Sequence, residues 1–282
     1  MMKIKEIVAK DYPYIILPSS REEVLEVMRK NRVFFLPVLE KYTYKPKGIL
    51  TLESFFEKPD ETQVALLVRR DIITLDEECE IKEAILQMME RKTRHIIVTR
   101  NSKYVGVLSI KHLIDKVIAR MNIRESIKDI YRKNVLTVWD QTPLFIAFKI
   151  MELAKTHVLI AINDKLMPSG ILTLEDIAKY CETIKRETRS LLSAPSESEE
   201  WEWNVQTIVY IAKKQLMIPR NIKVYDAMTK KIVPVNKYAS ISSCAKIMSR
   251  HDYSQLPVLD AEGNLVGIIF DEDLLKTIVK YL

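Results

Sequence analysis

The chain is poor in the residues that most often mark disulfide and zinc chemistry. Among 282 residues there are only three cysteines and four histidines. Cys79, Cys181 and Cys244 are odd in number, lie far apart and form no Cys-X-X-Cys pair. This pattern argues against a disulfide framework and against a structural zinc site. We expect the three cysteines to serve as small apolar residues.

Long hydrophobic runs are also missing. No apolar stretch approaches the roughly 18 residues that a membrane span needs. The opening MMKIKEIVAKDYP carries lysines but lacks the apolar core of a signal peptide. We therefore expect a cytoplasmic protein with no membrane partner.

Neither the charge nor the motifs indicate nucleic-acid binding or catalysis. The net charge of +6 is the small difference between 44 basic and 38 acidic residues, which are interspersed rather than gathered in a basic stripe. The histidines form no His-Glu-X-X-His or other metal spacing, and the chain has no Gly-X-Ser-X-Gly elbow and no phosphate loop. The sequence predicts a protein that is not an enzyme and makes nucleic acid an improbable partner.

Glycine is scarce as well, and four of the five glycines share one local context. They stand in GILTLES, GVLSIKH, GILTLED and GIIFDED, at Gly48, Gly106, Gly170 and Gly267. The intervals are 58, 64 and 97 residues. A chain with so few glycines is expected to place them where the backbone needs conformational freedom or where another segment comes close to it. Four glycines in one context therefore predict one structural unit used four times, with an insertion before the last.

Each unit predicts the order strand, helix, strand, strand, helix. In the second unit these are DIITL, EIKEAILQMMERKT, HIIV, YVGVLS and KHLIDKVIAR. Ile81, Ala84, Ile85 and Met88 have the spacing of an amphipathic helix. The fold class is therefore α/β (α+β), with small sheets that helices cover on one face.

A unit near sixty residues buries only about 60% of its unfolded surface, so we expect the units to pair. The first module spans residues 1–121, with units 1–62 and 63–121. The second spans residues 122–282, with units 122–183 and 220–282 around an insertion at 184–219.

The insertion contains the acidic tract SAPSESEE, which is typical of a flexible surface segment. The following WEWNVQTIVYIAKKQLMIP predicts a helix that ends at Pro219, with Val205, Ile208, Val209 and Ala212 at helical spacing. Trp201 and Trp203 are expected to pack on the domain surface rather than to stack on a base.

The fourfold pattern of an opening β strand, an LPV or IIV strand, and glycine followed by two apolar residues, Thr or Ser and then Asp, resembles tandem CBS domains, which pair into Bateman modules. The resemblance covers all four units and leaves about 184–219 unmatched. It implies a regulatory protein whose clefts bind AMP, ADP, ATP or S-adenosylmethionine, with no cofactor required. In the family the hydroxyl contacts the phosphate or ribose side, the Asp holds the ribose hydroxyls, and the first strand lines the adenine pocket.

Only the third unit carries the whole motif, with Gly170, Thr173 and Asp176. The first unit has Thr51 with Ser54, the second has Ser109 with His112, and the fourth has Phe270 with Asp273. We therefore expect the ligand at Thr173 and Asp176.

Neighbouring candidates are weaker. Thr137 corresponds to the strand position that lines the adenine, and His157 precedes the next strand, where it could face phosphate. Arg94 and His95 occupy the same place in the second unit. A second candidate site has Pro234, Ser254 and Asp273, where we expect Phe270 to block the cleft rather than to stack on a base.

The same residues also fit a purely structural role. Thr173 and Asp176 have the spacing of a helix capping box, in which the hydroxyl and the carboxylate bond reciprocally to backbone N–H groups. Two functions stay open, and a third, nucleic-acid binding through a basic face, ranks below them. In the first, an adenosine ligand changes the conformation that an unidentified effector recognises. In the second, a ligand-independent module docks a partner or a second copy as a homodimer through its helical faces.

Overall fold

The computed structural model describes residues 2–193 and 206–282, and it confirms the mixed α/β class. The first unit contains β1 (Ile15–Ile16), α1 (Arg21–Asn31), β2 (Phe35–Leu39), β3 (Pro46–Thr51) and α2 (Leu52–Glu57). The second unit contains β4 (Thr74–Asp76), α3 (Ile81–Glu90), β5 (His95–Arg100), β6 (Lys103–Ser109) and α4 (Ile110–Lys116). The predicted order of elements holds in both.

The other two units repeat this order. The third unit contains β7 (Thr137–Trp139), α5 (Leu144–Ala154), β8 (Val158–Ile162), β9 (Pro168–Thr173) and α6 (Leu174–Tyr180). The fourth unit opens with the short α7 (Val224–Ala227) and continues with β12 (Val235–Asn236), α8 (Ile241–His251), β13 (Gln255–Leu259), β14 (Leu265–Phe270) and α9 (Asp271–Ile278).

Each unit has a three-stranded sheet whose second strand is central. The first strand pairs with it in parallel and the third pairs with it antiparallel. The central strands are nearly continuous apolar runs; all five residues of β2, for example, are buried. A strand covered on both faces needs such a run, since neither face meets water.

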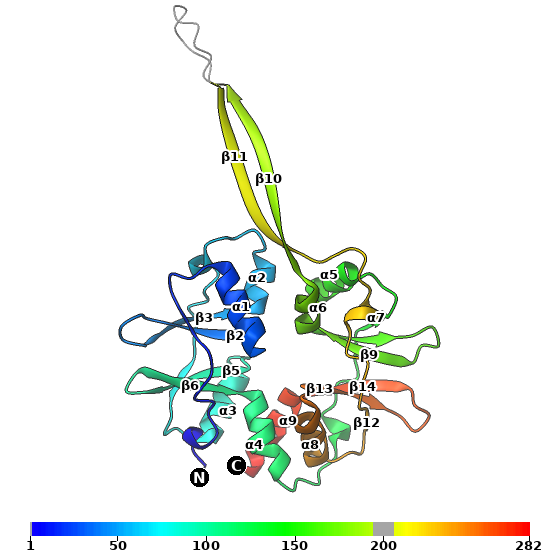
Figure 1. The fold of residues 1–282 in the computed structure, drawn as a ribbon. Coiled ribbons are helices and arrows are strands. Elements are labelled where there is room, and N and C mark those ends of the chain that lie inside the picture. Colours follow the sequence, from blue (N-terminus) through cyan, green and yellow to red (C-terminus); the bar gives the residue numbers. More distant parts are fainter. Residues whose placement is uncertain (1, 194–205) are drawn as a thin grey trace, which may run out of the picture.

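The sheets face each other in two pairs, which form the two sides of the molecule in Figure 1. Between the first and second units, Phe35 packs with Ile97 and Val107. Between the third and fourth, Ile160 and Ile171 pack with Ile268. The module boundary at residues 121 and 122 stays a prediction.

The four repeated glycines lie where the opening segment of one unit crosses the third strand of its neighbour. The isolated β-bridges at these crossings are Ala9 to Val107, Arg69 to Ile49, Arg132 to Ile268 and Thr229 to Ile171. A Cβ on Gly106 would stand 2.2 Å from the carbonyl oxygen of Ala9, and one on Gly267 would stand 2.6 Å from that of Arg132. Close backbone approach therefore explains these glycines, and the units of each pair exchange their opening segments.

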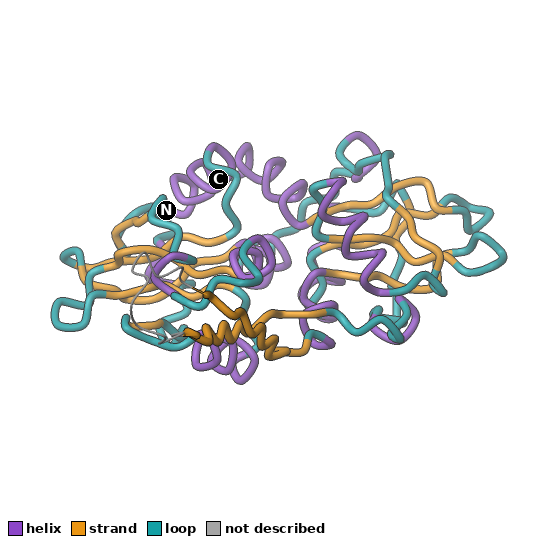
Figure 2. The backbone as a smooth tube through the Cα atoms, turned by 90° about the horizontal axis from the view of Figure 1, so that it is seen from above, coloured by secondary structure: helices purple, strands orange, loops and turns teal. Residues whose placement is uncertain are grey.

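The two halves of the molecule contact each other through their helices, and these contacts are more extensive between some units than between others. The second and fourth units share one apolar core, in which α4 packs against α8 and α9. The first and third units have separate cores and meet through Phe56 and Phe148, whose ring centroids are 4.9 Å apart. From above, helices lie between the two groups of strands (Figure 2).

The insertion forms a β-hairpin, so the predicted helix is wrong. Strands β10 (Glu182–Ser193) and β11 (Gln206–Met217) pair antiparallel from Glu182 opposite Met217 to Ser193 opposite Gln206. The hairpin points away from the four units (Figure 1). The segment TIVYIA is rich in β-branched and aromatic residues, which favour strands, and spacing alone does not separate helix from strand in so dense an apolar run. Trp201, Trp203 and the acidic tract lie outside the described residues.

Candidate ligand-binding site

A central cavity of about 1380 Å³ is lined by residues from all four units. Every histidine of the chain lines it, and so does Arg94. His157 of the third unit therefore lies at the same cavity as Arg94 and His95 of the second, a grouping that the sequence did not predict. Basic and acidic side chains both contribute to the lining, among them Arg94, Lys179, Asp176 and Asp271. The cavity wall thus combines charged side chains with apolar ones.

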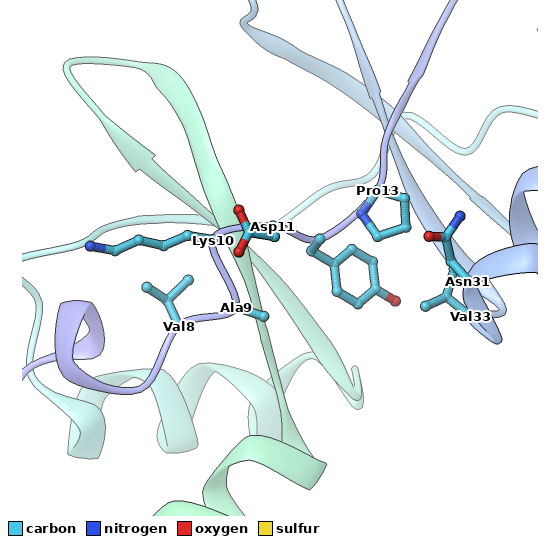
Figure 3. A pocket seen from close by; sticks show the side chains of 8 residues that line it. Val8, Ala9, Lys10, Asp11, Pro13, Asn31 and Val33 are labelled. Atoms are coloured by element: carbon cyan, nitrogen blue, oxygen red, sulfur yellow. The ribbon is translucent and has the colours of Figure 1, made fainter.

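A second, shallower hollow of about 540 Å³ follows the opening segment of the first unit from Val8 to Pro13 and reaches Asn31 and Val33 (Figure 3). The close-up shows the Lys10 side chain extending away from the Asn31 end. Its lining lacks a paired hydroxyl and carboxylate. The candidate site is therefore in the central cavity.

At the β9–α6 junction, Thr173 caps the helix together with Asp176. The carboxylate oxygen Oδ2 of Asp176 accepts hydrogen bonds from the backbone N–H of Thr173 at 3.1 Å and from its hydroxyl at 2.8 Å. In return the Thr173 Oγ1 accepts from the backbone N–H of Asp176 at 3.3 Å. The capping box expected from the spacing is present.

The second carboxylate oxygen of Asp176 has a different environment. Asp176 is 4% exposed, yet it lines the cavity, and its Oδ1 accepts from the Lys179 Nζ at 2.7 Å. The Lys179 side chain is 64% exposed, and an ion pair with so exposed a lysine contributes little to stability. Oδ1 is therefore an acceptor whose present partner can exchange for another donor.

The cavity next to Asp176 is completed by the fourth unit. Ile171 and Thr229 exchange backbone hydrogen bonds of 3.0 and 2.8 Å, and Thr229, Ser254 and Gln255 line the same cavity as Thr173. Ser254 of the fourth unit thus lines the same cavity as Thr173 of the third, a grouping that the sequence did not reveal.

Thr137 and Pro234 have other positions. Neither lines this cavity in the part of the chain that the structure describes. Thr137 lies on β7, directly after the segment whose Arg132 and Val135 contact Asp273 and the apolar cluster around Phe270. Pro234 is exposed just before β12. The third unit's first strand therefore follows a segment that contacts the fourth unit's carboxylate.

Asp273 is held by an arginine of the same chain. Arg132 donates from Nε to Oδ2 at 2.9 Å and from Nη2 to Oδ1 at 2.9 Å, and it also pairs with Glu272. The guanidinium carbon stands 4.4 Å from the centroid of the Phe270 ring. Phe270 thus supports a guanidinium, and the planar, bidentate pair covers the carboxylate of the second candidate site.

The first two units lack a carboxylate at the equivalent junction. In the first, the Ser54 Oγ lies 3.2 Å from the Thr51 Oγ1. In the second, Nδ1 of His112 accepts from the Ser109 N–H at 3.1 Å. Burial lowers the pKa of His112, which keeps the ring neutral and able to accept this bond. A neutral imidazole nitrogen thus takes the structural role of Asp176 without its charge.

Arg94 and His95 have structural partners in the cavity wall. Arg94 donates from Nη1 to Oδ1 of Asp271 at 3.0 Å and from Nη2 to Oδ2 at 2.6 Å, which ties the second unit to the fourth. Burial raises the pKa of Asp271. His95 stacks on Phe35 with ring centroids 4.3 Å apart, and burial lowers its pKa to about 3. Asp271 was missed from the sequence because it stands two positions before the motif Asp.

Comparison with known proteins agrees with this architecture. The family model for the CBS domain matches residues 4–61, 64–119, 127–183 and 224–280. The chain belongs to the CBS domain family. Within the described residues no helix is long and apolar enough to cross a membrane, and no group of three or more His, Cys, Asp or Glu is placed to hold a metal.

Archaeal proteins are among the relatives of this chain. The uncharacterized protein MJ1426 of Methanocaldococcus jannaschii is 26% identical over 166 residues, which cover 58% of this chain and 98% of that protein. The crystal structure of protein MJ1225 of the same organism matches with a TM-score of 0.75 at 17% identity, over 98% of this chain and 100% of that one. An uncharacterized conserved protein of Pyrococcus horikoshii matches with a TM-score of 0.64 at 24% identity over the same shares. These structural matches show a common fold.

Proposed function

We propose that this chain is a regulatory protein that binds one adenosine-containing compound at the junction of Thr173 and Asp176. The supporting observation is the state of the Asp176 carboxylate, which is nearly buried, lines the cavity and offers an oxygen that only an exposed lysine holds. AMP, ADP, ATP and S-adenosylmethionine share the ribose that such an oxygen would bind. The chain's own residues need no further cofactor for this binding.

The chemistry of a ribose suits this carboxylate. Vicinal hydroxyls would donate to Asp176, and each charge-assisted bond contributes about 1.5 to 3 kcal/mol. Lys179 and His157 line the same cavity and supply positive or donor groups for phosphate oxygens. Thr173 stays the cap of α6 and presents its hydroxyl at the cavity wall.

The cavity also suits a regulatory role. Because all four units line it, a ligand that contacts more than one of them stabilises the arrangement of units that makes those contacts. The first and third units have separate cores and share few apolar contacts, so a ligand can most easily change the arrangement of the units there. An effector that prefers one arrangement would then respond to the ligand.

Calorimetric titration of the full chain with AMP, ADP, ATP and S-adenosylmethionine tests this proposal. We expect one equivalent of at least one compound to bind, and we expect its 2′-deoxy counterpart to bind roughly ten- to a hundredfold more weakly. The absence of binding by all four, together with unchanged thermal stability at high ligand concentration, would favour a ligand-independent interaction module.

A further inference from the structure

The outer face of α5 is apolar, although it is exposed. Phe145, Ile146 and Leu153 are 38%, 40% and 75% exposed, while Leu144, Ala147 and Met151 of the same helix are buried in the core. The buried residues therefore account for the packing of α5 on its own unit, and the exposed apolar residues take no part in that packing. The exposed apolar residues lie on one side of the helix within about two turns of one another, with the exposed Lys149 between Ile146 and Leu153.

The internal repeat shows that the fold does not require this surface. The corresponding helices α1, α3 and α8 each bury a methionine at the same place, so Met28, Met88 and Met248 align with Met151. Five positions before that methionine, where α5 has Ile146, the other helices have Glu23, Glu83 and Ser243.

The second exposed position gives the same contrast. Two residues after the methionine, where α5 has Leu153, the others have Lys30, Glu90 and Arg250. All six of these alternative residues are exposed. The apolar face of α5 is thus a property of the third unit alone, and packing within the unit does not explain it.

We propose that this face of α5 is a self-association surface through which two copies of the chain pair. The charges on the face favour a second copy as the occupant. Lys149 and Glu152 lie beside Leu153, pair with each other at 3.0 Å and are both more than half exposed. In an antiparallel pairing of two α5 helices, a two-fold axis places Lys149 of each copy next to Glu152 of the other. The face is therefore complementary to itself in charge as well as apolar.

Such a dimer would be concentration-dependent. One helix face buries less area than a standard permanent interface, so its two copies separate on dilution. Its centre would be made of aromatic and branched apolar side chains, while the lysine stem adds apolar cover around them.

Sedimentation over a range of protein concentrations tests the proposal with two charge-substituted variants. The first carries Ile146→Glu with Leu153→Glu, and the second carries Ile146→Lys with Leu153→Lys. Because charged residues already occupy the equivalent positions of α1 and α3, both variants are expected to fold, which circular dichroism checks. Wild type should form dimers, each variant alone should be monomeric, and an equimolar mixture of the two should form dimers again, since opposite charges then meet.

The control is Leu86→Glu on α3, which removes an exposed leucine outside the proposed face and should leave the dimer intact. A wild-type chain that stays monomeric at every concentration would overturn the proposal and leave the face to a different partner. Variants that dimerise as wild type does, or a mixture that stays monomeric, would overturn it as well.

Discussion

Arg132 binds the carboxylate of Asp273 through two hydrogen bonds of 2.9 Å, whereas Asp176, the equivalent residue of the third unit, has only the exposed Lys179 on its outer oxygen. The two strand–helix junctions occupy equivalent positions in their units. They differ in which side chain of the protein binds the carboxylate. A carboxylate already paired with a guanidinium has no free acceptor in the plane of that pair. This difference is the basis on which we propose a ligand at Asp176 and a structural role for Asp273.

Removal of Arg132 should destabilise the chain without improving ligand affinity at Asp176. Asp273 is 5% exposed, and loss of its partner leaves a charged group short of hydrogen bonds, which costs about 1 to 3 kcal/mol. Urea unfolding of Arg132→Ala measures this loss. Arg132→Lys keeps the charge but not the bidentate geometry and should lose less. An unchanged free energy of unfolding in Arg132→Ala would show that the pair contributes nothing.

The Arg94–Asp271 pair makes a pH-dependent prediction. In Arg94→Met the Asp271 carboxyl stays buried without its cation, so the variant should lose about 3 to 5 kcal/mol at neutral pH. Burial raises the pKa of Asp271 above its unfolded value, so the stability of the variant is greatest at low pH and falls as the pH rises through that raised value. Denaturation curves of the variant at several pH values check the direction. The double variant Arg94→Met with Asp271→Asn should remove the pH dependence of this site.

His95 should make wild type less stable in acid. Its folded pKa of about 3 lies below its ordinary value of 6.5, so the unfolded chain binds the proton more readily. The contribution of His95 is complete above pH 6.5 and declines as the pH falls toward 3, at no more than about 1.4 kcal/mol per pH unit for one proton. His95→Phe keeps a ring to stack on Phe35 but cannot titrate. A shallower acid dependence in this variant supports the assignment, and identical profiles contradict it.

The glycine crossings differ in their tolerance of a methyl group. At Gly106 the added Cβ would meet the backbone oxygen of Ala9 at 2.2 Å, so the crossing segment must shift. At Gly170 the nearest atom is the Met228 sulfur at 2.5 Å, the flexible end of a side chain. Thermal unfolding should therefore show a larger loss for Gly106→Ala, on the order of 1 to 3 kcal/mol or more, than for Gly170→Ala. The reverse order would contradict the backbone-contact explanation.

The sequence predicts the repeat well because the repeat is local. The glycine contexts, the apolar central strands and the helix caps at Thr173 and Ser109 each depend on residues a few positions apart. It does not predict contacts made at long range. Arg132 and Asp273 are 141 positions apart, and Arg94 and Asp271 are 177 apart.

The crossing of the opening segments could not be predicted for the same reason, because it too depends on contacts between distant residues. No local pattern indicates that Thr229 pairs with Ile171, so the sequence groups Thr137 with Asp176, while the structure brings Thr229 and Ser254 to the cavity that Asp176 lines. The hairpin of β10 and β11 depends likewise on pairing between two strands that the chain separates. Propensity within one segment was not enough to exclude a helix there.

Calorimetry of Asp176→Asn beside Asp273→Asn tests the central claim most directly. Both substitutions keep an oxygen that accepts the cap hydrogen bond from the backbone N–H, and both remove the charge. Asp273→Asn also weakens the pair with Arg132, so its stability is measured beside its affinity. With an adenosine ligand that binds wild type, Asp176→Asn should lose roughly ten- to a hundredfold in affinity and Asp273→Asn should bind as wild type does. Equal affinities in wild type and Asp176→Asn, or a loss confined to Asp273→Asn, would contradict the assignment of the ligand to Asp176.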